Sequence, residues 1–200
     1  MVITELDDIT IRQLQSPEDV ARWRASFTGA YQTIFSGFPY FERFSPAEAE
    51  GVYQKLTSTP KNITLVATKG ESQVVGFGVG IPLRHHSGVS RELDGLVPIR
   101  HTFYLAELGV LPAYRGRGIG RTLVQERMRR VDRGAFSHVL LRVSTNNTPS
   151  SEMYRAMGFE DMGVYMDVAA MRTDGRVISD RRFFMSRVLS QVELDPAHSR

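Results

Sequence analysis

The residues with the clearest chemical potential form a Gly-rich turn with interleaved arginines. Glycines stand at Gly116, Gly118 and Gly120, and arginines at Arg115, Arg117 and Arg121. Glycine lets the backbone come close to a ligand and point successive N–H groups into one concavity. A helix that begins at the turn adds its unpaired amides and the positive end of its dipole. The pattern therefore predicts an anion site that a diphosphate fits.

Other phosphate motifs fit this turn less well. The dinucleotide fingerprint would need a third glycine where Arg121 stands, and no Gly-Lys-Ser/Thr run of a P-loop occurs. The glycines can also serve only as a tight strand-to-helix turn, and that interpretation stays open. Residues 115–133 carry no aromatic side chain after Tyr114, so the stacking platform of a nucleic-acid site is missing and no nucleic-acid partner is expected.

Hydrophobic periodicity and turn residues predict the elements that hold this turn. Ser16 and Ser45, each followed by proline and acids, are typical of helix starts, and further helices are expected over residues 118–133 and from Thr148 to Gly158. Residues 82–100 read as a long polar loop. Seven strands are expected, over residues 9–14, 63–68, 73–81, 103–110, 138–143, 162–171 and 182–189.

This order predicts an α/β fold of the α+β type: a mixed, mostly antiparallel sheet of about seven strands with about four helices on both faces. The hairpin at Gly70 argues against a doubly wound nucleotide fold. The 200 residues suit a single domain with its core over about 9–189, and residues 190–200 are expected to be disordered.

The composition excludes several classes of protein. The chain has no cysteine, which removes disulfides, thiolate metal sites and a cysteine nucleophile, and fits a cytoplasmic location. No apolar run is long enough to span a membrane, so no membrane partner is expected. His85 and His86 stand together, but no further ligand has a suitable spacing, so they are expected to be a solvated loop pair and no metal is predicted.

Two motifs in order carry a resemblance to a known family. Arg115 to Gly120 fits the pattern Arg/Gln-x-x-Gly-x-Gly/Ala, preceded by a strand that ends in Val110-Leu111-Pro112. Downstream, Asn147 precedes Tyr154 by seven residues, and Gly158-Phe159 follows. Both segments, and the order of elements along nearly the whole chain, resemble the GNAT superfamily of acetyl-CoA-dependent N-acetyltransferases.

The resemblance implies acetyl-CoA as co-substrate and assigns the residues that bind it. In this family one strand bulges and splays from its neighbour, and the pantetheine arm lies in the wedge. Backbone groups of Leu108, Gly109 and Val110 would pair with that arm, with the bulge at Gly109. The pyrophosphate would lie on residues 115–120, which include Arg117 and Ile119, and Arg121 would add charge. Asn147 would bind the cofactor arm, or serve as a turn residue before the Thr148 helix, or both.

The resemblance also implies roles in transfer of the acetyl group to a primary amine. Tyr154 would protonate the departing thiolate, or it only packs with Met153 and Met157. Glu107 would take the ammonium proton directly or through water, or it is a surface or ion-paired carboxylate. The Val110 N–H would stabilise charge on the thioester oxygen. Because the chain has no cysteine, the transfer is expected to be direct, in a ternary complex.

The acceptor is left open between small-molecule and peptide amines. Variable regions of the family here supply aromatic, histidine and acidic side chains: Tyr31, Phe35, Phe38, Tyr40, Phe41, Phe44, His85, His86, Glu92 and Asp94. Aromatic rings and acids suit a cationic amine, although many of these rings can be core residues. A non-catalytic acetyl-CoA-binding regulatory or scaffold module, or transfer to other acceptors, are the alternatives. Exposed final strands make a homodimer possible.

Overall fold

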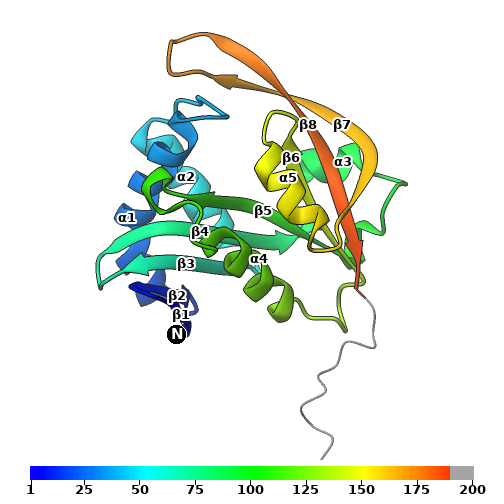
Figure 1. Cartoon of the computed structure of the whole chain (residues 1–200). Helices are drawn as coiled ribbons and strands as arrows, with labels where there is room; N and C mark the ends of the chain where they lie inside the picture. Colours follow the sequence, from blue (N-terminus) through cyan, green and yellow to red (C-terminus); the bar gives the residue numbers. More distant parts are fainter. Residues whose placement is uncertain (190–200) are drawn as a thin grey trace, which may run out of the picture.

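A single open sheet organises the computed structural model, which describes residues 1–189 (Figure 1). The expected tail, residues 190–200, lies outside the described part. The strand order is β1-β2-β3-β4-β5-β6-β8-β7, and only β5 and β6 pair in parallel. The strands are β1 Val2–Leu6, β2 Ile9–Gln13, β3 Ile63–Lys69, β4 Gln73–Pro82, β5 Thr102–Val110, β6 His138–Ser144, β7 Glu160–Met171 and β8 Val177–Val188.

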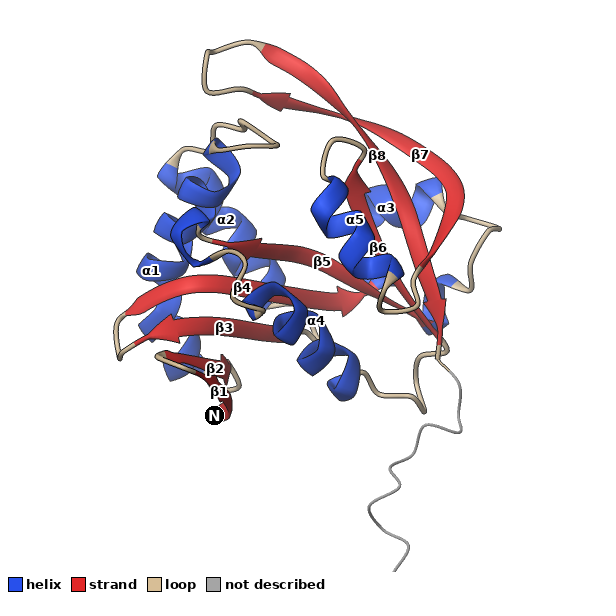
Figure 2. Ribbon diagram, in the orientation of Figure 1, coloured by secondary structure: helices blue, strands red, loops and turns tan. Residues whose placement is uncertain are grey.

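Helices cover both faces of the sheet (Figure 2). Their bounds are α1 Pro17–Ser36, α2 Pro46–Thr57, α3 Ser87–Glu92, α4 Ile119–Arg130 and α5 Thr148–Arg155. One core cluster joins α1, α2 and α3 to one face, and a second joins α4 and α5 to the other. The predicted starts of α1 and α2 are confirmed as complete capping boxes, at Ser16 with Asp19 and at Ser45 with Glu48. The predicted fold class is therefore confirmed.

Two elements go beyond the expected set. The sheet has eight strands because β1, a short and partly charged edge strand, pairs with β2 across a tight turn at Asp7. The expected loop over residues 82–100 instead folds as two 3₁₀ turns, Leu83–His85 and Ile99–His101, on either side of α3. Val89 and Leu93 are buried and fix α3 against the sheet. The helix was not predicted because most residues of this segment are polar. No helix within residues 1–189 is long and apolar enough to cross a bilayer.

The expected divergence of two strands occurs between β5 and β6. They pair only from Thr102–His138 to Leu105–Leu141, although β5 continues to Val110 and β6 to Ser144. The register of β5 against β4 also shifts between Tyr104 and Glu107. The bulge therefore lies before Glu107, and the prediction that placed it at Gly109 was wrong.

Close packing by a helix explains the glycine at 109. A Cβ there would stand 2.8 Å from the Phe77 ring and 3.1 Å from Ile34, which reaches down from α1. We expect Gly109→Ala to lower the free energy of unfolding by about 1–3 kcal/mol, because a well-packed site must shift to admit the methyl group. Gly120→Ala, whose Cβ would meet only an ordinary contact at 3.8 Å, is the matched control. Urea unfolding measures both, and equal stability of the two variants would contradict this account.

A long hairpin reaches across the molecule to the α1–α2 connection. Strands β7 and β8, orange to red in Figure 1, are joined by a turn that contains Gly175. Near that turn, Arg43 donates its backbone N–H to Met171 O at 2.8 Å, and Thr173 donates to Phe41 O at 2.9 Å. Residues 37–44 and the hairpin thus form one wall beside the divergent strands.

Candidate functional site

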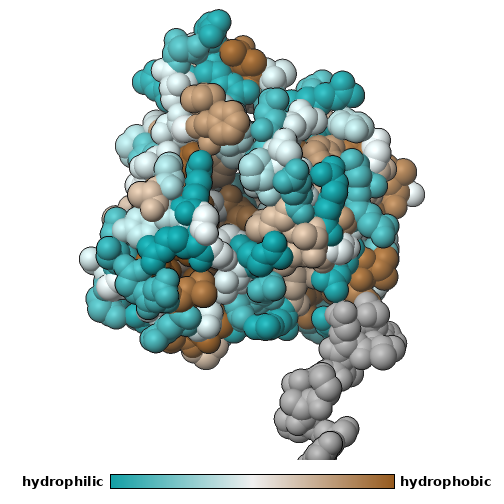
Figure 3. Space-filling model, in the orientation of Figure 1, coloured by the Kyte–Doolittle hydropathy of each residue, from teal (hydrophilic) through white to brown (hydrophobic). Residues whose placement is uncertain are grey.

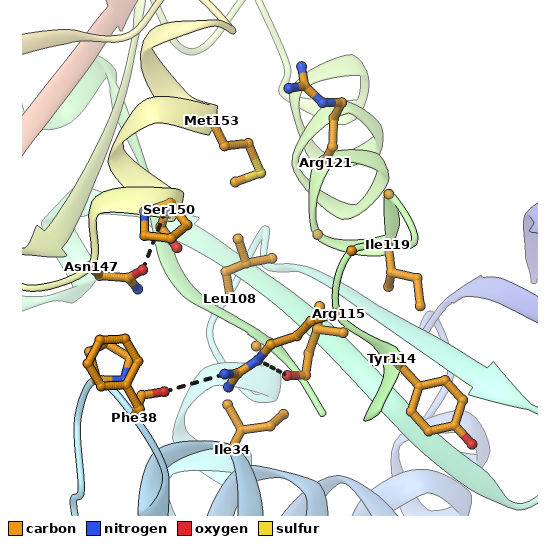
Figure 4. A pocket seen from close by; sticks show the side chains of 17 residues that line it. Ile34, Phe38, Leu108, Tyr114, Arg115, Ile119, Arg121, Asn147, Ser150 and Met153 are labelled. Carbon is orange, nitrogen blue, oxygen red and sulfur yellow. Dashed lines mark hydrogen bonds between the residues drawn. The ribbon is translucent and has the colours of Figure 1, made fainter. Parts of the chain in front are cut away.

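The divergence of β5 and β6 opens onto a cavity of about 490 Å³, here called the outer cavity (Figure 4). The space-filling view shows a hollow in this face with apolar residues inside it (Figure 3). The lining contains most residues predicted to bind the cofactor: Leu108, Gly109, Val110, Arg115, Gly116, Gly118, Ile119, Gly120, Arg121 and Asn147. Three separate segments, namely β5, the Gly-rich turn with α4, and the start of α5, therefore meet at one site.

The Gly-rich turn presents free backbone donors to the outer cavity. Gly116 and Gly118 adopt φ values of 77° and 80°, in the left-handed region that favours glycine. Gly118 caps α4 without any side-chain hydrogen bond. Within residues 1–189 no acceptor is found for the backbone N–H groups of residues 116–121. A row of unpaired donors at a helix N-terminus fits a phosphate group.

Arg115 and Arg117 of the turn differ in the position of their side chains. Arg115 donates to Val110 O at 3.1 Å and to Phe38 O at 3.4 Å, which ties β5 to the α1–α2 connection. Arg117 instead pairs with Asp8 at the β1–β2 turn, and its side chain does not line the cavity. No pattern in the sequence indicated this pairing, because the hairpin that holds Asp8 had not been predicted.

The edge of β5 also offers backbone groups. Residues of an antiparallel strand face their partner alternately, and Leu111 N–H bonds Val75 O of β4 at 2.8 Å. The N–H groups of Leu108 and Val110 therefore point away from β4, toward the gap left by β6. Extended backbone with free donors at this edge suits an amide-containing ligand arm.

A second, smaller cavity of about 60 Å³, here called the inner cavity, lies next to the outer one. Leu108, Asn147 and Ser150 line both. The inner lining is polar and combines tyrosines, arginines and one carboxylate; its other members are Phe35, Tyr40, Tyr104, Leu105, Ala106, Glu107, Arg142, Val143, Tyr154 and Arg182. Both residues predicted to be catalytic, Glu107 and Tyr154, thus lie in one small chamber beside the cofactor-sized cavity.

Glu107 has the electrostatics of a proton acceptor. Burial raises the pKa of its carboxyl to about 7, although the positive charges of Arg182 and Arg142 oppose that rise. No ion pair to Glu107 is formed within the described part of the chain. A carboxylate with a pKa near neutrality accepts a proton more readily than an ordinary glutamate does.

Tyr154 is a buried phenol beside a buried cation. Its side chain is 6% exposed, packs edge-on against Phe159, and its pKa is raised well above the ordinary value by burial, with Arg127 opposing the rise. Arg127 from α4 is fully buried and enters the β5 bulge, where Nη1 donates to Val79 O and Glu107 O, both at 3.0 Å. Arg127 also lies directly behind Gly78, where a Cβ would approach its Nε to 2.8 Å. The phenol therefore stays protonated at neutral pH.

Asn147 holds the junction of the two cavities. It is the N-cap of α5, accepting from Ser150 N–H at 3.4 Å, and its amide donates to the Tyr40 hydroxyl at 3.0 Å. The sequence left open a role for Asn147 as a turn residue before α5, and the structure shows that Asn147 is the N-cap of this helix. Its place in both linings is compatible with a role in ligand binding.

The predicted acceptor residues divide into three groups. Phe35 and Tyr40 line the inner cavity and Phe38 the outer one. Tyr31 and Phe44 are packed in the core of the α1 face, and Phe41 is exposed. His85, Glu92 and Asp94 are exposed residues of the 3₁₀–α3 segment and line neither cavity.

His86 is not the solvated residue that was expected. It caps α3 by accepting from Val89 N–H at 3.2 Å, and its ring meets Tyr104 edge-on with centroids 5.2 Å apart. Burial lowers the pKa of this imidazole, so it is neutral at physiological pH. Its role in this structure is to cap and pack.

A buried ionic network beside the inner cavity escaped the sequence analysis. Glu42 pairs with Arg182 and, at 3.7 Å, with Arg172; Arg182 also bonds Asp180 at 2.8 Å. These residues come from the α1–α2 connection and from the β7–β8 hairpin, more than 100 residues apart in the chain. No local pattern signals such a pairing. The network fixes the wall that these two segments form.

Comparison with known proteins gives a consistent assignment. The sequence profile of the acetyltransferase (GNAT) family matches residues 24–159. The chain is 37% identical over 90 residues to N-alpha-acetyltransferase RimI of Mycobacterium tuberculosis, covering 45% of this chain and 53% of that protein. It is 27% identical over 167 residues to mycothiol acetyltransferase of Acidothermus cellulolyticus, covering 80% of this chain and 47% of that protein. These alignments span about half the length of the curated relatives.

Solved structures share the fold at low sequence identity. A ribosomal-protein-alanine N-acetyltransferase from Brucella melitensis superimposes with a TM-score of 0.62 at 23% identity, covering 90% of this chain and 99% of that one. Arabidopsis thaliana NAA60, solved with a bisubstrate analogue, gives 0.60 at 18% identity, with 91% and 99% covered. Since the family profile covers more than half of the sequence and the fold agrees, the chain belongs to the acetyltransferase (GNAT) family.

Proposed function

We propose that this protein transfers the acetyl group of acetyl-CoA directly to a primary amine, with both substrates bound at once. The observation that carries the proposal is that the two cavities are adjacent and share Leu108, Asn147 and Ser150 in their linings. The outer cavity offers free backbone donors to a diphosphate and a strand edge to a pantetheine arm. The inner cavity offers a proton acceptor and a proton donor where the thioester would end.

The proposed chemistry divides two proton transfers between two residues. Glu107 takes a proton from the acceptor ammonium, and the freed amine attacks the thioester carbon. The Val110 N–H stabilises charge that develops on the thioester oxygen. As the carbon–sulfur bond breaks, Tyr154 gives its proton to the departing thiolate, which leaves as free thiol. The second proton of the attacking nitrogen then passes to the Tyr154 oxygen, and Glu107 releases its proton to solvent. No cysteine is available for an acetylated enzyme intermediate, which supports the direct route.

The test combines binding with turnover. Isothermal titration with acetyl-CoA measures donor binding, and thiol release is then followed across a panel of primary amines. Saturable binding together with amine-dependent thiol release supports the proposal. Binding without release on any amine would favour a non-catalytic acetyl-CoA-binding module, and absence of binding would contradict the assignment of the Gly-rich turn.

Two arginines of the same turn provide a matched pair for donor binding. Arg121 lines the outer cavity and forms no hydrogen bond or ion pair within residues 1–189, whereas Arg117 pairs with Asp8 outside the cavity. We expect Arg121→Ala to weaken acetyl-CoA binding by about 5- to 20-fold, the usual effect of one partly exposed phosphate contact. Arg117→Ala is expected to change the affinity by less than about twofold. Titration calorimetry at one salt concentration measures both, and the reverse order of effects would contradict the structure.

A further inference from the structure

One arginine of the inner cavity has no anionic partner. Arg142 lies on β6, and its guanidinium makes one hydrogen bond in the described structure, from Nη1 to the Met166 sulfur at 3.1 Å. Arg182, the other arginine of this cavity, is paired with Glu42 and Asp180. Arg142 is thus the member of this lining whose charge is not matched by a carboxylate within ion-pairing distance.

A thioether is a weak acceptor, so this contact leaves most of the binding capacity of the guanidinium unused. A half-buried cation without a counter-ion is costly, and arginine's planar fork matches a carboxylate in two parallel hydrogen bonds. A ligand carboxylate can replace the sulfur at little cost. Arg142 therefore has the features of an anion-binding group.

Arg142 lies near the proposed base. Arg142, Glu107 and Tyr104 line the same small cavity, and the positive charge of Arg142 opposes the rise in the pKa of Glu107. The inner cavity thus presents a carboxylate and an unpaired guanidinium within a volume of about 60 Å³. That volume admits roughly four to six water-sized atoms. An ammonium, one carbon and a carboxylate together make five non-hydrogen atoms.

We propose that the acceptor of this protein is an amino acid or a similar small amine that carries a carboxylate next to the amino group. Its ammonium lies at Glu107 and its carboxylate at Arg142. This inference rests on the proposed acetyltransferase function and narrows its acceptor. Polyamines lack the carboxylate, and a peptide N-terminus has a neutral amide at that position.

The experiment compares free amino acids with their amides, which have nearly the same shape but no carboxylate. Glycine with glycinamide, and alanine with alaninamide, are tested at one pH by thiol release from acetyl-CoA. We expect wild-type kcat/KM to favour the free acids by about 10- to 100-fold, the range of a charge-assisted contact. Arg142→Met is expected to bring the ratio close to one, with the larger loss of kcat/KM on the free acids. Arg142→Lys is expected to give an intermediate ratio.

Three controls separate the possible results. Thermal unfolding shows whether the variants are folded, and Arg24→Met, on the exposed side of α1, is expected to leave the ratio unchanged. Titration of the amino acid into protein saturated with CoA reads acceptor binding without turnover, and binding lost in Arg142→Met supports the proposal. An equal or greater rate on amides or peptide N-termini, or an unchanged ratio in Arg142→Met, would overturn this inference alone. Bound acetyl-CoA without turnover of any amine would overturn the proposed function, and this inference with it.

Discussion

Replacing Tyr154 by phenylalanine is expected to lower kcat by about 10²- to 10⁴-fold, the usual contribution of a positioned general acid. The variant removes one oxygen from the inner cavity and leaves the outer cavity unchanged, because Tyr154 lines only the former. Affinity for acetyl-CoA should therefore stay within about twofold of wild type. The phenylalanine ring keeps the edge-on packing against Phe159 and loses only the contact of the hydroxyl with Arg127, so the thermal midpoint should change little. Steady-state kinetics, titration calorimetry and thermal unfolding measure the three quantities.

Two other tyrosines make this prediction specific. Tyr165 is exposed on β7 outside both cavities, so Tyr165→Phe is the control and should keep wild-type kinetics. Tyr40 lines the inner cavity and accepts from Asn147. A large loss of kcat in Tyr40→Phe together with an active Tyr154→Phe would move the proton donor to Tyr40 and contradict the assignment made here.

Replacing Glu107 by glutamine is expected to lower kcat by about 10²-fold or more and to change the pH profile. Because burial raises the pKa of Glu107 to about 7, the wild-type carboxyl is protonated, and inactive as a base, at lower pH. Wild-type kcat/KM, which reports ionisation of the unliganded enzyme, should therefore rise through about pH 7. In Glu107→Gln this rise near pH 7, here called the limb, should disappear. The separate rise that comes from deprotonation of the free amine, with a pKa of ~10, should remain in kcat/KM.

The control for this variant is Glu152→Gln, an exposed carboxylate on α5 that lines neither cavity. It should keep both the rate and the limb near pH 7. Retention of that limb in Glu107→Gln would show that another group titrates there, and near-wild-type kcat would show that Glu107 is not the base.

The same substitution should stabilise the protein at alkaline pH. The pKa of Glu107 is about 7 in the folded chain against 4.5 for an ordinary glutamate, so the unfolded chain releases this proton first as pH rises. The wild-type free energy of unfolding therefore decreases as the pH rises from 4.5 to about 7, and it is constant at higher pH. Glutamine carries no such proton. At pH 8 the free energy of unfolding of Glu107→Gln should exceed that of wild type by up to about 3 kcal/mol. Near pH 4 the two free energies of unfolding should be equal.

The sequence was most informative where chemistry lies in contiguous residues. The spacing of Gly116, Gly118 and Gly120 predicted a phosphate-sized site at the start of a helix, and the structure places free amides and a large cavity there. The capping serines of α1 and α2 were equally local signals. Each of these features depends on residues within a few positions of one another, which is why pattern and spacing sufficed.

Features that depend on distant partners could not be predicted in this way. The direction of the Arg117 side chain is set by Asp8, which lies 109 residues earlier in a hairpin that has no strong pattern. Gly109 suggested a bulge, but its reason is the approach of Ile34 and Phe77, and the bulge itself lies closer to Arg127. Arg142 resembles any charged residue on a strand until the fold shows which carboxylates are already paired.

The position of Arg127 behind Gly78 limits the order in which this region can change during evolution. A methyl group on residue 78 would collide with the Arg127 guanidinium, which is held by buried carbonyl groups on two strands. A mutation at 78 is therefore harmful while the arginine is present, but it becomes tolerable once a shorter side chain occupies 127. If Arg127 is replaced by a shorter side chain first, a later mutation at 78 causes no collision. Homologues that lack the arginine are thus free to vary at 78, and this dependence would appear as covariation between the two positions.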